Sequence, residues 1–289
     1  MPVDGVEGLK RQRPEWSPWL SVVEEALHEA TAVRWERAVP STAGPESVPL
    51  LSGATIIVDE TEIDRLLRRL IGIAWHAGTP AMATLRNVAV REMSLSDLFA
   101  ASVVQDMKRV AAIATTHQVD EQAFQAVVAL VSLPFLQACN RQAGPARTRN
   151  WTSGYCPVCA SWPAFAEVRG IERSRYLRCG RCGAEWYARI LHCGYCGNTD
   201  HDELTMLVPE SAGFAGAVEA CRRCKSYLKA FTRLQGCRPP AVMIEDLASV
   251  ALDVAALEQG YARPEGTGCA LGITIESSAG KAGSLAWNG

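Results

Sequence analysis

Residues 156–224 contain the pattern that decides the fold, a two-residue spacing between paired cysteines that occurs four times. The pairs are Cys156-Pro157-Val158-Cys159, Cys179-Gly180-Arg181-Cys182, Cys193-Gly194-Tyr195-Cys196 and Cys221-Arg222-Arg223-Cys224. A gap of this length lets both thiolates of one turn face the same small volume, so each pair supplies half of a tetrahedral four-thiolate site. Four pairs therefore predict two metal sites.

The spacing between the pairs indicates which of them share a site. About twenty residues separate the first pair from the second, and a slightly longer segment separates the third from the fourth, as in four-cysteine zinc sites. Strand-like segments inside both gaps favour sequential pairing. The first predicted site is then Cys156, Cys159, Cys179 and Cys182, and the second is Cys193, Cys196, Cys221 and Cys224. The alternative is an interleaved arrangement, in which the first pair joins the third and the second joins the fourth.

The residue that follows each pair bears on how tightly the turn can close. This position often requires a positive φ angle, which glycine adopts without a steric penalty. Gly183 and Gly197 satisfy the requirement, whereas Ala160 and Lys225 do not. We therefore expect the turns before Ala160 and Lys225 to be slightly strained or differently shaped.

The clustering of the cysteines favours metal binding over other uses of thiols. Eight of the eleven cysteines lie in this one stretch. A redox Cys-x-x-Cys is expected beside a strand–helix–strand pattern, which is not evident here. A disulfide scaffold would be a short secreted chain. Tetrahedral thiolate coordination suits zinc and iron alike, so we expect two metal ions in four-cysteine sites, iron or zinc.

Other residues near the sites are expected to play supporting roles. With four thiolates available for each site, His192 and His201 are not expected to be ligands. The remaining cysteines are isolated and are expected to be inert: Cys139, Cys237 and Cys269. Several basic residues are expected to offset the negative charge of a four-thiolate centre: Arg178, Arg181, Arg222, Arg223 and Lys225. No catalytic constellation accompanies them, and we expect a protein that is not an enzyme.

Residues 1–150 predict a helical domain. Asp59-Glu60-Thr61-Glu62 has the spacing of a capping box, and a buried stripe at helical period follows it: Ile63, Leu66, Leu67, Leu70, Ile71 and Ala74. Another helix is expected from Ser94 or Ser96 to Ala114. A further one is expected to be capped by Asp120 and kinked or ended by Pro134.

Residues 151–235 alternate short strand-like segments with cysteine turns, which is typical of tandem rubredoxin-like or zinc-ribbon modules. Strands are expected at 163–168, 175–177, 185–191, 217–220 and 227–231. A C-terminal helix within 236–263 is expected to pack on the ribbons through Ile244, Leu247, Val250, Ala251, Val254 and Leu257. Residues 264–289 are rich in Gly and Ser and predict a partly mobile tail. The predicted fold class is α+β, with an N-terminal all-helical domain, two tandem ribbons and a C-terminal helix.

The bulk composition excludes several classes of protein. The 289 residues carry a net charge of −2, with no strongly basic half, which argues against a nucleic-acid partner. No apolar run of about 18 residues occurs, so membrane insertion is not expected. Met1-Pro2-Val3-Asp4-Gly5 lacks the charged and then apolar pattern of a signal peptide, so we expect a cytoplasmic protein.

The order of motifs resembles one known family, the formate dehydrogenase accessory protein FdhE. The resemblance covers residues 155–263 and rests on more than the cysteines. It includes Tyr155-Cys156-Pro157-Val158-Cys159, Trp162-Pro163, Arg175-Tyr176-Leu177-Arg178-Cys179, Cys182-Gly183-Ala184-Glu185-Trp186, Tyr227-Leu228-Lys229, Glu245-Asp246-Leu247-Ala248-Ser249, Asp253 and Gly260-Tyr261-Ala262-Arg263.

This resemblance implies a cytoplasmic maturation factor that binds the catalytic subunit of a formate dehydrogenase. It also implies an association with iron in a rubredoxin-like setting, and it carries the metal-ligand role onto the eight paired cysteines but no catalytic residue. One alternative is a redox protein that passes an electron to the same client through iron. Another is a zinc-ribbon protein that binds nucleic acid.

Overall fold

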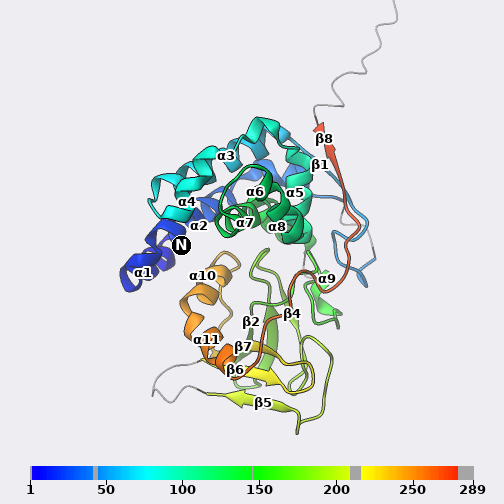
Figure 1. The fold of residues 1–289 in the computed structure, drawn as a ribbon. Helices are drawn as coiled ribbons and strands as arrows, with labels where there is room; N and C mark the ends of the chain where they lie inside the picture. Colours follow the sequence, from blue (N-terminus) through cyan, green and yellow to red (C-terminus); the bar gives the residue numbers. More distant parts are fainter. Residues whose placement is uncertain (1, 42–44, 145, 209–215, 279–289) are drawn as a thin grey trace, which may run out of the picture. The chain divides into compact units, whose positions relative to one another are not determined.

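The computed structural model describes residues 2–41, 45–144, 146–208 and 216–278 (Figure 1). The chain forms two compact units. The first comprises Met1–Ser41, Leu51–Gln142 and Leu271–Gly289, and the second comprises Thr42–Leu50 and Ala143–Ala270. The first unit therefore contains both the N-terminal helices and the C-terminal segment, and the second contains all eight paired cysteines.

The first unit is built mainly of helices. They are α1 (Pro2–Gln12), α2 (Ser17–Glu29), α3 (Glu60–His76), α4 (Pro80–Ala83), α5 (Leu95–Val104), α6 (Met107–Thr116), α7 (Glu121–Val131) and α8 (Leu133–Ala143), with the 3-10 turns η1 (Pro14–Trp16), η2 (Val33–Ala38), η3 (Thr84–Asn87) and η4 (Val90–Glu92). Strands β1 (Thr55–Val58) and β8 (Thr274–Ser277) add a short parallel pair. Strand β8 belongs to the segment expected as a mobile tail, whose residues 279–289 lie outside the described ones.

Helix α3 forms as the sequence predicts. The Asp59 carboxylate accepts a hydrogen bond from the backbone N–H of Thr61 at 2.9 Å, which caps the first turn. All members of the predicted stripe are buried: Ile63, Leu66, Leu67, Leu70, Ile71 and Ala74. The local capping signal and the helical period together define this element.

The helix expected from Ser94 or Ser96 to Ala114 is interrupted, and the prediction of one continuous helix is wrong. Helix α5 ends before Gln105, which has a φ of 59° and lies in the left-handed region. The Asp106 side chain then accepts a hydrogen bond from the N–H of Arg109 at 3.0 Å and caps α6. Because the chain turns here, α5 and α6 bury their apolar faces separately.

Helices α7 and α8 follow each other around Ser132 and Pro134. Asp120 caps α7, as predicted, through a hydrogen bond of 2.8 Å from the N–H of Ala123. Together the two helices are long and apolar enough to span a membrane, unlike what the sequence led us to expect. However, 72% of their most apolar window is buried within the protein, which is the character of a core helix.

The second unit contains one six-stranded sheet with the strand order β4-β3-β2-β7-β6-β5. Its strands are β2 (Phe165–Arg169), β3 (Ser174–Arg178), β4 (Glu185–Tyr187), β5 (Leu204–Leu207), β6 (Gly216–Cys221) and β7 (Ser226–Arg233). Strands were predicted close to β2, β3, β6 and β7. The segment expected as a strand at 185–191 is shorter, and β5 was not predicted.

The two ribbons are joined through a parallel pairing of β2 with β7. In this pairing Phe165 lies opposite Lys229 and Arg169 lies opposite Arg233. All other neighbours in the sheet are antiparallel. The tandem ribbons therefore form one continuous sheet rather than two separate modules.

The predicted C-terminal helix is two helices, α10 (Ala241–Ala248) and α11 (Val250–Glu258). The chain breaks at Ser249, whose φ of −104° and ψ of 22° leave the helical region. This break changes the buried face, because Val254 and Leu257 are exposed and Ile244 alone of the predicted stripe is buried. The residues that pack with the sheet are instead Val242, Leu252 and Ala256, against Phe165, Val218, Ala220, Tyr227 and Phe231.

Candidate metal centres

All four cysteine pairs form the same tight turn. The residue after each second cysteine has a positive φ angle: 56° at Ala160, 77° at Gly183, 73° at Gly197 and 56° at Lys225. The two glycines were predicted to take this conformation. Ala160 and Lys225 adopt it as well, at a cost of about 1–2 kcal/mol each, so these two turns are strained but not differently shaped.

Backbone hydrogen bonds close these turns in a repeated pattern. In the first turn, the N–H of Ala160 donates to the carbonyl of Cys156 at 3.0 Å, and the N–H of Cys156 donates to the carbonyl of Ser161 at 2.9 Å. The second and third turns repeat both bonds, with Cys179 and Cys193 in the place of Cys156. The repeated geometry directs both thiols of a pair to the same side.

The structure brings the cysteines together in the sequential arrangement. Within each set of four, the sulfur atoms all lie within 4.8 Å of one another. In the first set, Cys156 Sγ lies 3.4 Å from Cys182 Sγ and Cys159 Sγ lies 3.6 Å from Cys179 Sγ. In the second set, the corresponding distances are 3.7 Å for Cys193–Cys224 and 3.8 Å for Cys196–Cys221. A metal–sulfur bond of about 2.3 Å implies sulfur–sulfur edges of about 3.8 Å, so both sets can hold one tetrahedral metal ion.

The two sets differ in their exposure to solvent. The first set is completely buried at all four positions. In the second set Cys193 and Cys221 are buried, Cys224 is half-buried and Cys196 is exposed. The first site is therefore closed, whereas the second reaches the protein surface.

Comparisons with known proteins give FdhE proteins as similar to parts of this chain. A family model described as the C-terminal domain of FdhE matches residues 191–268. The FdhE homolog of Aquifex aeolicus is 34% identical over 119 residues, and the FdhE protein of Escherichia coli O127:H6 is 30% identical over 188 residues. Over these regions the chain is similar to FdhE proteins. A crystal structure of the FdhE protein from Pseudomonas aeruginosa shares the fold, with a TM-score of 0.62 at 23% identity over 91% of this chain and 92% of that one.

The aligned regions cover only part of these FdhE relatives. The match includes 40% of this chain and 41% of the Aquifex aeolicus protein, and 64% of this chain and 57% of the Escherichia coli protein. The chain thus spans about half the length of the curated relatives that it matches.

Several of the residues that carry the resemblance to FdhE converge in a partly buried charge cluster that the sequence alone did not reveal. Lys229 on β7 lies 2.7 Å from Asp246 Oδ1 and 2.8 Å from Asp253 Oδ2. Arg263 Nη2 lies 2.7 Å from each of the same two carboxylates. The Tyr227 hydroxyl donates to Asp253 at 2.7 Å. The signal available in the sequence was a lysine within the apolar strand Tyr227–Phe231.

A second charge cluster surrounds Glu167, which is completely buried on β2. Arg178 Nη1 lies 2.9 Å from its carboxylate, and Arg169 also pairs with it. The N–H of Cys237 donates to Glu167 Oε1 at 3.0 Å. Arg178 was expected to balance the charge of a metal site, but its buried guanidinium is paired with Glu167 instead. Arg222, Arg223 and Lys225 are exposed beside the second site.

Aromatic rings connect the two cysteine regions. Trp162 lies between Tyr155 and Tyr195, with edge-to-face ring contacts at centroid distances of 6.1 Å and 5.3 Å. Backbone also meets backbone here, because a Cβ atom on Gly154 would lie 1.6 Å from the carbonyl oxygen of Gly194. The entry to the first turn therefore packs directly on the third turn, and only glycine fits at position 154.

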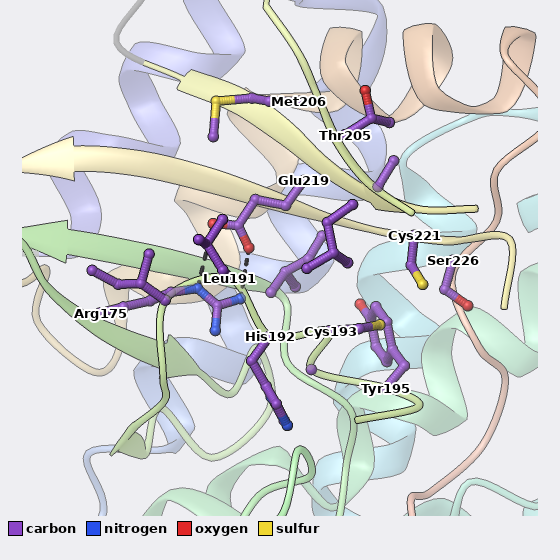
Figure 2. A pocket seen from close by; sticks show the side chains of 15 residues that line it. Arg175, Leu191, His192, Cys193, Tyr195, Thr205, Met206, Glu219, Cys221 and Ser226 are labelled. Carbon is purple, nitrogen blue, oxygen red and sulfur yellow. Dashed lines mark hydrogen bonds and ion pairs between the residues drawn. The ribbon is translucent and has the colours of Figure 1, made fainter. Parts of the chain in front are cut away.

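A pocket of about 160 Å³ lies beside the second site. Figure 2 shows Cys193 and Cys221 in its wall, together with the ion pair between Arg175 and Glu219. Leu191 and Met206 are exposed at its rim. His192 also lines this pocket, whereas His201 is exposed outside it, and both four-sulfur groups found among the described residues consist of cysteine alone.

Proposed function

We propose that this chain is an accessory factor of the FdhE type for the maturation of formate dehydrogenase. The observation that carries the proposal is the combination of two four-sulfur sites with the similarity to FdhE proteins. The charge cluster around Lys229 adds support, because it is built from motif residues outside the cysteine turns. In this role the protein acts as a chaperone for another protein and is not itself an enzyme.

Each site would hold one metal ion, iron or zinc. The ligands would be Cys156, Cys159, Cys179 and Cys182 in the first site and Cys193, Cys196, Cys221 and Cys224 in the second. The sulfur–sulfur distances fit a four-thiolate ion of either metal. A bound ion would join both turns of a ribbon, and such structural sites contribute folding free energy directly.

The proposed client is the catalytic subunit of formate dehydrogenase, bound in the cytoplasm. The test is capture of that subunit by the tagged full-length chain from its native host, grown anaerobically with added iron and zinc. Recovery of the subunit supports the proposal. Its absence from metal-loaded, folded protein would refute it. A tagged unrelated zinc-ribbon protein serves as the control for capture by the metal alone.

A rubredoxin-like redox protein acting on the same client is a second candidate, and the exposure of the second site favours it. Electron exchange with a partner requires a centre near the surface, and Cys196 and Cys224 provide this access. Visible absorption and metal analysis after anaerobic purification separate the two candidates. A colourless protein that contains only zinc and retains full maturation activity would remove the redox candidate.

A further inference from the structure

The two ribbons are repeats of one pattern, and their strands correspond one to one. Each ribbon runs from a cysteine turn through two antiparallel strands to a second turn and then to a third strand. Strands β2, β3 and β4 of the first ribbon thus correspond to β5, β6 and β7 of the second. In the sheet order β4-β3-β2-β7-β6-β5, the repeats are arranged head to tail.

In this arrangement the outer edges of β2 and β5 are equivalent, but within the described part of the chain only the edge of β2 is paired with another strand. The edge of β2 that faces away from β3 is covered by β7, in parallel. The equivalent edge of β5, facing away from β6, pairs with no strand among the described residues. The first three residues of β2 are buried, whereas none of the four residues of β5 is. Among the residues that the structure describes, the edge of β5 in the second ribbon is therefore unpaired at the position where β2 in the first ribbon pairs with β7.

The hydrogen-bonding groups on this open edge can be assigned. The N–H of Arg222 donates to the carbonyl of Glu203 at 2.8 Å, one step before the paired register begins at Leu204 and Cys221, so Leu204 and Cys221 form a non-hydrogen-bonded pair. In an antiparallel ladder such pairs, whose N–H and C=O groups point away from the partner strand, alternate with hydrogen-bonded pairs. Leu204 and Met206 therefore direct their backbone groups outward, whereas Thr205 and Leu207 direct theirs to β6.

The side chains of β5 do not protect its outer edge against pairing with another strand. The strand Leu204-Thr205-Met206-Leu207 carries no charge, although natural edge strands are usually protected by charged residues or proline. Leu204 and Met206 line the pocket beside the second site. A pocket of about 160 Å³ is smaller than the usual site for a free metabolite and suits a single apolar side chain.

We propose that the outer edge of β5 binds an extended apolar segment of a protein partner as an added parallel strand, with one large side chain in the adjacent pocket. Parallel addition follows from continuity with the pairing of β7 on β2. The equivalent donor in a second copy of this chain would be β4, which has only three residues and contacts α9 (Ala146–Arg149). We therefore assign the added strand to a different protein. Only its identity as the formate dehydrogenase subunit rests on the proposed function.

The test compares variants at one outward-facing position. Met206→Pro removes the outward N–H without touching the bonds of Thr205 and Leu207 to β6. Met206→Ala shortens the side chain but keeps that N–H, and is the matched control. Leu204→Pro removes the second outward donor and gives an independent repeat of the test. Metal content and melting temperature establish that each variant is folded.

The probe is an array of short peptides that includes random sequences and overlapping segments of the catalytic subunit. We expect the wild-type chain to select peptides with apolar residues at alternate positions, and bound peptides to slow amide exchange at 204–206. Met206→Pro and Leu204→Pro should weaken binding about tenfold or more, and Met206→Ala much less.

The possible results distinguish a failure of the β5 proposal from a failure of the proposed function. Absence of peptide binding to the folded wild-type protein, or equal binding by Met206→Pro and Met206→Ala, would overturn the inference. If the wild-type chain associates with itself and Met206→Pro does not, the assignment of β5 to a different protein would be overturned. Capture of the whole catalytic subunit by wild type and Met206→Pro alike would refute the role of β5 and leave the proposed function standing. Peptide selection without capture of that subunit would support the role of β5 and refute the proposed function.

Discussion

Lys229 on β7 donates a hydrogen bond of 2.6 Å to the backbone carbonyl of Asp246, and its ammonium lies 2.7 Å from the carboxylate of the same residue. The lysine is completely buried. One side chain therefore holds both the backbone and the carboxylate of α10 against the sheet of the ribbons. Because Asp253 of α11 joins the same cluster, both C-terminal helices are attached through Lys229.

Replacing Lys229 by methionine should detach these helices. The substitution keeps the length of the side chain but leaves Asp246 and Asp253 with Arg263 as their remaining cation, at a cost of about 3 kcal/mol in the free energy of unfolding. Chemical denaturation of the metal-loaded protein measures this loss in the free energy of unfolding. Lys108→Met, at an exposed position of α6, is the control, and equal stability of the two variants would contradict the role given to Lys229.

The carboxylate of Glu167 predicts a specific dependence of stability on pH. Burial alone would raise the pKa of Glu167, but the N–H of Cys237 and the guanidinium groups of Arg169 and Arg178 lower it below its ordinary value. The ionised group therefore stabilises the fold above the unfolded pKa of about 4.5, and this stability is lost as the pH falls through the lower pKa of the folded state.

Glu167→Gln should remove this part of the pH dependence. At neutral pH the variant should be less stable by about 3 kcal/mol, because the buried Arg178 loses its nearer and buried charged partner and keeps only the half-exposed Glu185 at 3.6 Å. Unfolding measured across the acid range, with the exposed Glu265→Gln as control, tests both statements. A variant whose stability falls with acid as steeply as that of wild type would refute the assignment.

The cysteine turns could be predicted because their determinants are local. A two-residue gap and the identity of the following residue decide the turn, and the cap at Asp59 depends on neighbouring residues in the same way. The breaks at Gln105 and Ser249 were not predicted, because the apolar period continues across both positions. At Ser249, the Asp246 carbonyl also accepts from Lys229, a residue that is distant in sequence.

The pairings between strands that are distant in the chain could not be predicted from the sequence for a related reason. The parallel registers of β2 with β7 and of β1 with β8 join segments that are far apart in the chain. Neither pair has a connecting turn that would mark its register. Strand β5 carries little alternation between buried and exposed residues, since none of its residues is buried. The grouping of the cysteines in two sets of four was therefore predictable, while the sheet and charge clusters that surround them were not.

The contact between Gly154 and Gly194 predicts a large effect from one methyl group. Gly154→Ala would place Cβ 1.6 Å from a backbone oxygen, so one of the two cysteine turns must move. We expect a loss of about 3 kcal/mol or more in the free energy of unfolding. Gly72→Ala on α3, where a Cβ meets nothing within 4 Å, should be neutral or slightly stabilising. Similar melting temperatures for the two variants would show that the close contact is absent in solution.

The difference in exposure between the two sites predicts an order of metal release. A chelator reaches Cys196 and Cys224 from solvent, whereas the first site must open before its sulfurs are accessible. We expect one metal ion to leave rapidly and the other to stay until the ribbon unfolds. Cys196→Ser should lose the rapid phase and Cys159→Ser the slow one, with Cys269→Ser, outside both sites, as the control. Release of both ions at one rate would contradict this order.

Native mass spectrometry of the complex captured anaerobically from the native host tests the proposed function. We expect a species that contains this chain, two metal ions and one formate dehydrogenase catalytic subunit. A folded chain that carries both ions but never appears with the subunit would contradict the proposed function. A chain recovered with the subunit but without metal would contradict the role of the eight cysteines.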